Sequence, residues 1–163
     1  MSIAALLPSV RLTKPQRLRS VANWVNGSTA FGLVVASAGH CHIRRGPRGL
    51  WLADGYRFGF PVAGAFTVGN VLVTAHEWPA RVEKYPDLLG HEERHSWQYV
   101  VCGGLPFIPL YLASMGWSVL RTGDRAARNV FERDAGLAAG GYDDAPVRPL
   151  AVSMRALLSS RRR

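Results

Sequence analysis

Long uncharged apolar stretches alternate along this chain with short segments rich in glycine, proline and charged residues. At the start, the pattern predicts a helix over 14–38 that is broken near Gly27. The segment 13–16 (Thr-Lys-Pro-Gln) resembles a capping box, in which threonine and glutamine side chains satisfy free N–H groups, and proline is tolerated in a first helical turn. Because 28–38 carries no charge, we expect this half to be buried or to touch lipid.

Short strands are predicted over 43–74, where β-branched and aromatic residues are interrupted by turn signals. Segment 45–49 (Arg-Gly-Pro-Arg-Gly) predicts a turn. Asp54-Gly55 predicts a second hairpin, between 50–52 and 56–58. The run 65–74 is rich in valine and predicts one strand that is buried or nearly so.

Three more helices are predicted by apolar periodicity and by their stop signals. The first spans 87–102 and ends at a glycine pair, and the second spans 106–121. The third spans 124–139, with Asp124 as its N-cap. The remainder, 142–163, is predicted to be a loosely held tail with one short helix. The whole pattern predicts a single domain over 1–163 of the helix-dominated α+β class, with a small antiparallel β-sheet.

One apolar segment is long enough to raise the question of a membrane span. Residues 99–120 contain no charge, and a transmembrane helix needs about 20 such residues. Gly103, Gly104, Pro106 and Pro109 interrupt the segment and leave 107–120 as its continuous helical part. That length favours a buried or re-entrant helix over a full span.

Composition and charge narrow the possible partners. The 163 residues are 48% hydrophobic and 19% charged, with a formal net charge of +9. Such a charge favours nucleic acid or an anionic membrane surface. The arginines are dispersed, however, and no recognition helix or aromatic-basic pattern accompanies them, so nucleic acid is not the expected partner, and an anionic membrane surface is left open. Oligomeric state is left open.

The two cysteines, Cys41 and Cys102, do not form a disulfide framework or a metal knuckle. A reducing compartment is the simplest interpretation. We expect no cleaved signal peptide, because the basic region before the apolar run is long and Gly32 interrupts that run. The predicted location is cytoplasmic, with association at a membrane as the alternative.

The segment 91–95 (His-Glu-Glu-Arg-His) carries the strongest chemical signal in the sequence. Two imidazoles four residues apart lie on one face of a helix, so His91 and His95 can reach one cation. Glu92 lies beside them, where it can take a proton from a metal-bound water and later return it. Bound zinc lowers the pKa of water to roughly 7. The spacing therefore predicts a Zn²⁺ site in which His91 and His95 are ligands and Glu92 is the catalytic base.

A catalytic zinc usually has three protein ligands and one open position. Glu132, on the helix predicted to start at Asp124, is the preferred third ligand, because an antiparallel return would bring it against His91 and His95. Asp134 is the second choice and Asp124 the third. The alternative role for Glu132 is a surface ion pair with Arg128 at i, i+4.

Together, 91–95 and 132–135 (Glu-Arg-Asp-Ala) resemble the gluzincin metallopeptidases. In these enzymes a His-Glu-x-x-His helix is followed by a second helix that provides a glutamate ligand, commonly with alanine three positions on. The resemblance implies His91, His95 and Glu132 as ligands and Glu92 as general base. Segment 95–99 (His-Ser-Trp-Gln-Tyr) and segment 67–71 (Thr-Val-Gly-Asn-Val) are also similar to small bacterial proteins of this type.

Two features depart from that family pattern. Many gluzincins have an aspartate four positions after the ligand glutamate, and this chain has Gly136 there. A residue to stabilise the oxyanion is also not obvious, with Tyr142, His76 and Arg133 as weak candidates. The sequence predicts a zinc-dependent metallopeptidase that hydrolyses peptide bonds through Glu92-assisted attack of zinc-bound water. The alternative is a non-catalytic zinc-stabilised binding or scaffold protein, associated with a membrane. In zincins a strand beside the active helix pairs with substrate, and 65–74 could have that role.

Overall fold

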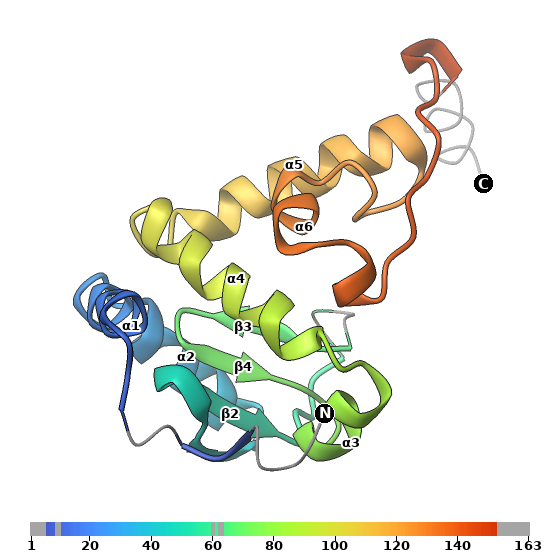
Figure 1. The fold of residues 1–163 in the computed structure, drawn as a ribbon. Helices are drawn as coiled ribbons and strands as arrows, with labels where there is room; N and C mark the ends of the chain where they lie inside the picture. Colours follow the sequence, from blue (N-terminus) through green and yellow to red (C-terminus); the bar gives the residue numbers. More distant parts are fainter. Residues whose placement is uncertain (1–5, 9–10, 60, 62–63, 153–163) are drawn as a thin grey trace. The chain divides into compact units, whose positions relative to one another are not determined.

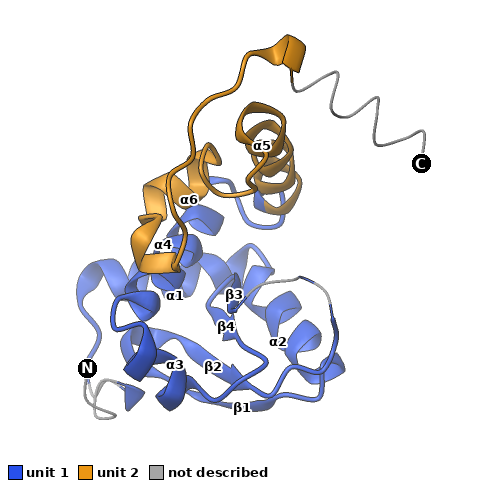
Figure 2. Cartoon of the chain, turned by 90° about the vertical axis from the view of Figure 1, so that its right-hand side faces the viewer, with its two compact units in different colours: residues 1–107 blue, residues 108–163 orange. Residues whose placement is uncertain are grey.

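The structure is a computed structural model that describes residues 6–8, 11–59, 61 and 64–152. It has the predicted helix-dominated α+β class, with a small four-stranded sheet in the first part of the chain (Figure 1). The chain forms two compact units, Met1–Phe107 and Ile108–Arg163 (Figure 2). The single domain over 1–163 stays a prediction.

The sheet is mixed, so the predicted antiparallel sheet is wrong for its central pair. The strand order is β1-β2-β4-β3. The outer pairs, β1 with β2 and β3 with β4, are antiparallel, whereas β2 and β4 are parallel. The segment between β2 and β3 is long enough to let the chain come back in the same direction, which a tight turn cannot do. The strands are β1 (His42–Arg45), β2 (Trp51–Asp54), β3 (Phe66–Val68) and β4 (Val71–Val73).

The single strand predicted over 65–74 is a hairpin made of β3 and β4. Val68 pairs with Val71, so Gly69 and Asn70 form a two-residue turn. Gly69 has φ +61°, and no positive φ occurs at Asn70, as in a type II′ turn with glycine first. A Cβ on Gly69 would lie 2.5 Å from the backbone of Ser28 and of Thr29. Glycine is required here both for its φ and for this close approach.

The turn predicted over 45–49 is confirmed, and the hairpin predicted at Asp54-Gly55 is wrong. The turn joins β1 to β2 and contains the short helix η2 (Pro47–Gly49). Residues 56–58, which were predicted to form the second strand of this hairpin, are not in a strand. Asp54 instead caps a helix. Its Oδ1 accepts a hydrogen bond at 2.6 Å from the N–H of Trp78, which is the first residue of that helix. A carboxylate at a helix start is favoured by the dipole.

The helix predicted over 14–38 is divided into two helices, and the division lies at Gly27, where the sequence predicted a break. These are α1 (Lys14–Val25) and α2 (Ser28–Ala38), and Gly27 between them has φ +78°. The predicted capping box is confirmed. The Thr13 side chain accepts from the Gln16 N–H at 3.4 Å, and the Gln16 side chain accepts from the Thr13 N–H at 3.0 Å.

Both faces of the sheet are covered. The pairing of Leu52 with Leu72 places both on one face, where they pack with Trp78 and Leu89 from the helices that follow the sheet. The neighbouring residues of the same strands point to the opposite face and pack with Ala36 of α2. The helices on the first face are α3 (Trp78–Lys84), which the sequence did not predict, and α4 (Leu88–Val101), which was predicted over 87–102.

Helix α5 (Phe107–Thr122) confirms the helix predicted over 106–121. The helix predicted over 124–139 is much shorter: α6 is Val130–Ala135, followed by the single turn η3 (Ala138–Gly140). Asp124 does cap backbone N–H groups, those of Ala126 and Ala127 at 2.8 Å, but it holds a turn rather than a helix start. The helix begins one turn later, where Asn129 accepts from the Phe131 N–H.

No helix within the described part of the chain is long and apolar enough to cross a membrane. The last eleven residues of the predicted tail, 153–163, lie outside the described residues.

Candidate metal centre

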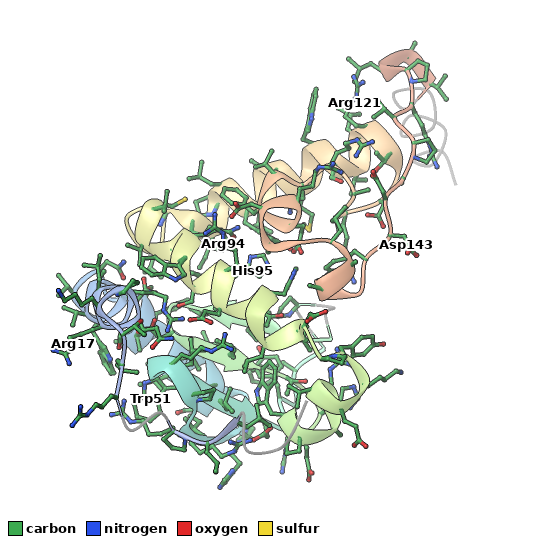
Figure 3. All side chains as sticks on the ribbon, in the orientation of Figure 1. Arg17, Trp51, Arg94, His95, Arg121 and Asp143 are labelled. Atoms are coloured by element: carbon green, nitrogen blue, oxygen red, sulfur yellow. The ribbon has the colours of Figure 1, made fainter. Side chains whose placement is uncertain are left out.

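Helix α4 places His91 and His95 on one buried face. Both imidazoles are nearly inaccessible to solvent, and their Nε2 atoms lie 3.1 Å apart. The two rings are close to perpendicular, with centroids 4.7 Å apart. Figure 3 shows His95 on α4. The i, i+4 spacing thus places the Nε2 atoms of His91 and His95 close enough to bind one cation, as the sequence predicted.

The second ring nitrogen of His95 is held by Gln98, one helical turn further along α4. His95 Nδ1 lies 2.8 Å from Gln98 Oε1. An amide oxygen only accepts hydrogen bonds, so Nδ1 carries the proton in this pair. In the neutral ring this leaves the lone pair on Nε2, the atom that faces His91. A hydrogen bond to the ring nitrogen that does not bind the metal orients a metal-binding histidine and fixes its tautomer.

Glu132 is on α6, and its side chain is 2% exposed. The side chain of Asn129, which accepts from the Phe131 N–H at 3.1 Å, starts this helix one turn before the carboxylate. The hydroxyl of Tyr111, on α5, donates a short hydrogen bond to Glu132 Oε1. The ring of Tyr111 also stacks on Phe131, with centroids 6.2 Å apart. Sequence reasoning missed Tyr111, since nothing in its local pattern separates it from the other apolar residues of α5.

Among the described residues, His91, His95 and Glu132 form a group that could hold a metal ion. Each is buried and offers one ligand atom; His91 and His95 belong to the first compact unit, and Glu132 belongs to the second. The donor set fits zinc, which accepts two histidines and a glutamate. Zn–N bonds of about 2.0–2.1 Å give a tetrahedral edge of roughly 3.3 Å, near the 3.1 Å between the two Nε2 atoms. Binding of zinc itself stays a prediction.

The other candidate ligands lie elsewhere. Asp134 is exposed, and Asp124 is engaged in its turn. His40, His42 and His76 are also exposed and do not belong to the group. The sequence ranked Glu132 above both aspartates, and the burial of its carboxylate agrees with that ranking.

Glu92, which follows His91 in α4, is also buried, and Thr67 of β3 contacts it. Thr67 Oγ1 lies 2.6 Å from Glu92 Oε2 and 3.2 Å from the Glu92 backbone oxygen. A hydroxyl has one hydrogen to donate and can also accept. Thr67 can therefore donate to the Glu92 carboxylate when it is charged, or accept from the carboxyl group when it is protonated and donate to the backbone oxygen. The sequence signal for Thr67 was its place in the 67–71 motif, but its contact was not predicted.

A buried polar network fixes α4 against the β3–β4 turn. Ser96 donates from Oγ to Asn70 Oδ1 at 3.0 Å. The Asn23 amide donates to the Ser96 backbone oxygen at 2.8 Å and to Asn70 Oδ1 at 3.1 Å. All three side chains are fully buried. Buried hydrogen-bonded groups resist rearrangement. This network therefore fixes the position of α4, the helix that carries Glu92, relative to strand β3, which carries Thr67.

Glu93, on the next position of α4, binds two arginines. Its carboxylate lies 3.5 Å from Arg19 Nη1 and 2.5 Å from Arg48 Nη1. The Arg19 side chain is fully buried, and burial lowers its pKa, although the Glu93 charge opposes this effect. Arg19 also donates to the Arg48 backbone oxygen at 2.5 Å. The cluster joins α1, the β1–β2 turn and α4, so the role of Glu93 is structural.

The two departures from the family pattern persist in the structure. Gly136 ends α6 with φ +90°, a conformation suited to glycine, and it offers no side chain to orient His91. Of the weak oxyanion candidates, His76 is exposed, and Arg133 bonds Asp144 and the Ala127 backbone oxygen. Tyr142 is half-buried. An oxyanion-stabilising role for any of the three stays untested.

Comparisons of the chain with protein-family models, with curated proteins and with solved structures find no match.

Proposed function

We propose that this protein is a zinc-dependent hydrolase of the gluzincin type that cleaves peptide bonds. The observation that supports the proposal best is the group of His91, His95 and Glu132, with Glu92 next to His91 in the sequence of α4. The two histidines and Glu132 would hold the metal. Bound zinc would act as a Lewis acid and lower the pKa of water toward neutrality.

The chain's own contribution to the reaction centres on Glu92. As general base it takes a proton from the attacking water, and as general acid it returns the proton to the departing amine. Thr67 supports both states, because its hydroxyl can donate to the carboxylate or accept from the carboxyl group. Gln98 keeps His95 in the tautomer with a free Nε2 lone pair. These contacts support a base that is pre-positioned rather than mobile.

The sheet offers a place for an extended peptide. In the strand order β1-β2-β4-β3, strand β3 is an edge, and within the described part of the chain it pairs with β4 alone. An edge strand can accept a peptide as a further strand, and β3 is the strand that carries Thr67, the partner of Glu92. The proposed substrate is therefore a peptide or protein segment in extended conformation. The proposed location is the cytoplasm, where Cys41 and Cys102, both free thiols, would stay reduced.

A second candidate function is a non-catalytic zinc-stabilised binding or scaffold protein. It is favoured by the burial of all three candidate ligands, which are 3%, 7% and 2% exposed for His91, His95 and Glu132. Structural zinc sites are closed, whereas catalytic sites keep an open position. Gly136 also favours this candidate, because it has no carboxylate that could accept a hydrogen bond from His91 and orient its ring.

Metal analysis and a hydrolysis assay separate these candidates. We expect the purified protein to hold one zinc per chain, and His95→Ala and Glu132→Ala to lose it while Asp134→Ala retains it. Glu92→Gln should retain zinc and lose hydrolysis of a casein-type peptide mixture. Zinc without hydrolysis in the wild-type protein, with a large fall in melting temperature on chelation, would establish the scaffold instead. A wild-type protein that binds no zinc overturns both.

A further inference from the structure

Helix α1 has the reverse of the usual burial pattern, because polar residues lie on its buried face and apolar residues lie on its exposed face. Arg19 and Asn23 are fully buried, whereas Leu18, Val21 and Val25 are 62%, 54% and 82% exposed. A surface helix normally turns its apolar stripe toward the core. The outward face of α1 therefore needs an explanation other than packing within the described chain.

The helix cannot rotate to bury its apolar face without losing its inner contacts. Arg19 donates to the Arg48 backbone oxygen and pairs with Glu93. Asn23 donates to Ser96 and Asn70 inside the buried network. Breaking such buried polar contacts leaves groups without partners in a water-free environment, which is costly. The exposed face is thus a fixed property of this fold.

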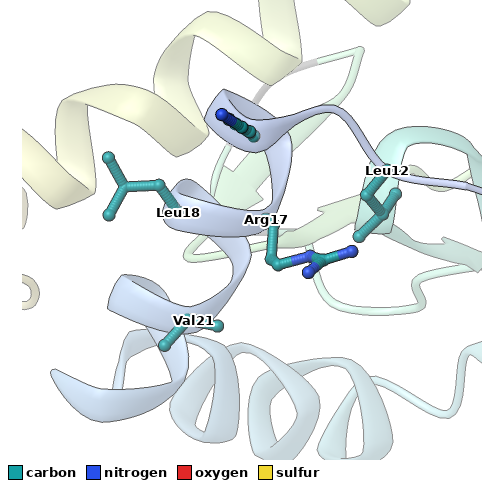
Figure 4. A pocket seen from close by; sticks show the side chains of 5 residues that line it. Leu12, Arg17, Leu18 and Val21 are labelled. Atoms are coloured by element: carbon teal, nitrogen blue, oxygen red, sulfur yellow. The ribbon is translucent and has the colours of Figure 1, made fainter.

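The exposed residues form one stripe with basic residues at its start. Lys14, Leu18, Val21 and Val25 follow each other at helical spacings of four, three and four, so they share a face. Arg17 adjoins them and lies on the outer side of α1 (Figure 3). We call this set, with the half-exposed Trp24, the α1 surface. One end of the α1 surface contains an open pocket of about 510 Å³ (Figure 4). The pocket is lined by Leu12, Lys14, Arg17, Leu18 and Val21.

The exposed charges of the α1 surface, those of Lys14 and Arg17, have a single sign. No acidic residue precedes Asp54 in the sequence, while seven lysines and arginines do. Neither Lys14 nor Arg17 makes an ion pair with any described residue. Their charges remain available to an anionic partner. Apolar side chains and a tryptophan next to unpaired basic residues are the combination that binds helices to the headgroup region of anionic membranes.

We propose that the α1 surface docks on an anionic lipid membrane, with α1 parallel to the membrane plane. The helix has 12 residues, so it is about 18 Å long, too short for a hydrocarbon core of about 30 Å. Leu18, Val21 and Val25 enter the boundary between headgroups and acyl chains, and Lys14 and Arg17 bind lipid phosphates. This inference is independent of the proposed hydrolase, because none of these residues belongs to the metal centre.

The test is flotation of the full-length protein with vesicles of phosphatidylcholine alone and of three parts phosphatidylcholine to one part phosphatidylglycerol. We expect binding to the anionic vesicles only, and weakening with salt. Lys14→Gln/Arg17→Gln should bind roughly thirtyfold more weakly. The control double variant Arg57→Gln/Lys84→Gln removes the same charge elsewhere in the unit and should bind like the wild type.

A second pair of variants tests the apolar stripe. Val25→Asp should reduce vesicle binding at least tenfold, and its control is Val101→Asp, at a valine that is also 82% exposed and also near a helix end. Equal effects of the two substitutions would overturn the proposal, as would absence of vesicle binding by the wild type. A wild-type dimer by light scattering that Val25→Asp converts to a monomer, without vesicle binding, would identify a second copy as the occupant and overturn the lipid proposal.

Discussion

The Thr67 hydroxyl lies 2.6 Å from Oε2 of Glu92 and joins the edge strand of the sheet to the helix that carries the two histidines. Both residues are buried, Thr67 to 8% and Glu92 to 3% exposure. A buried carboxylate needs hydrogen-bond donors in place of water. Thr67 supplies one, and it thereby also sets the direction in which the carboxylate points.

Replacement of Thr67 by valine removes this donor while keeping the side-chain volume. A hydrogen bond to a charged group contributes about 1.5–3 kcal/mol, so we expect kcat for peptide hydrolysis to fall roughly tenfold or more. KM and zinc content should stay the same, and Thr67→Ser should restore activity. An unchanged kcat in a zinc-loaded Thr67→Val protein would show that Thr67 does not position Glu92.

Gln98 should set the affinity of the site for zinc through His95. In Gln98→Leu the Nδ1–H of His95 loses its acceptor at 2.8 Å, and we expect the zinc affinity to fall about 10–100-fold. Gln98→Glu keeps an acceptor oxygen and should keep the affinity. Competition with a chromophoric chelator measures both variants. Equal affinities of the wild type and Gln98→Leu would exclude this role for Gln98.

Glu93 should matter for stability and not for chemistry. In Glu93→Gln the buried guanidinium of Arg19 loses its counter-charge, and we expect the free energy of unfolding to fall by about 3 kcal/mol. Glu83→Gln, at an exposed position of α3, is the control and should leave the unfolding midpoint unchanged. Urea unfolding followed by circular dichroism measures both. Similar midpoints for the two variants would contradict a structural role of the arginine cluster.

Gly69 and Gly55 separate the effect of a positive φ from that of a steric clash. Both have positive φ, but a Cβ at Gly55 meets nothing within 4 Å, whereas at Gly69 it meets the backbone of Ser28 and Thr29 at 2.5 Å. Gly55→Ala should cost about 1–2 kcal/mol, and Gly69→Ala at least about 3 kcal/mol, because the hairpin must also move away from α2. Thermal unfolding compares the two. Equal costs would show that α2 yields easily to the added methyl group.

Elements with strong local signals were predicted from the sequence. The capping box at Thr13, the break at Gly27, the helix over 87–102 and the apolar helix over 106–121 all follow from short-range patterns. The pairing of His91 with His95 also needs only helix geometry, since four residues complete about one turn. Each of these features depends on residues that lie within one or two helical turns of each other in the sequence.

Predictions failed where a side chain had a distant partner. Asp54-Gly55 resembles a hairpin turn, but the Asp54 carboxylate is used at the start of α3, 24 residues away. The run 65–74 resembles one strand, because alternation alone does not show that Gly69 must approach α2. The helix predicted from Asp124 starts at Val130, after the N-cap Asn129, since hydroxyls of Ser118 and Thr122 hold the Asp124 backbone oxygen in a turn.

The sequence by itself determined the break at Gly27, the helices over 87–102 and 106–121, the two imidazoles on one face and the glutamate between them, because bond geometry and side-chain spacing act over a few residues. Only the tertiary structure decided that β2 and β4 run parallel, that Thr67 supports Glu92, that Tyr111 binds Glu132, and that α1 turns its apolar face outward. These features arise from contacts between residues far apart in the chain. Their energies depend on which groups are buried together, and no local pattern contains that information.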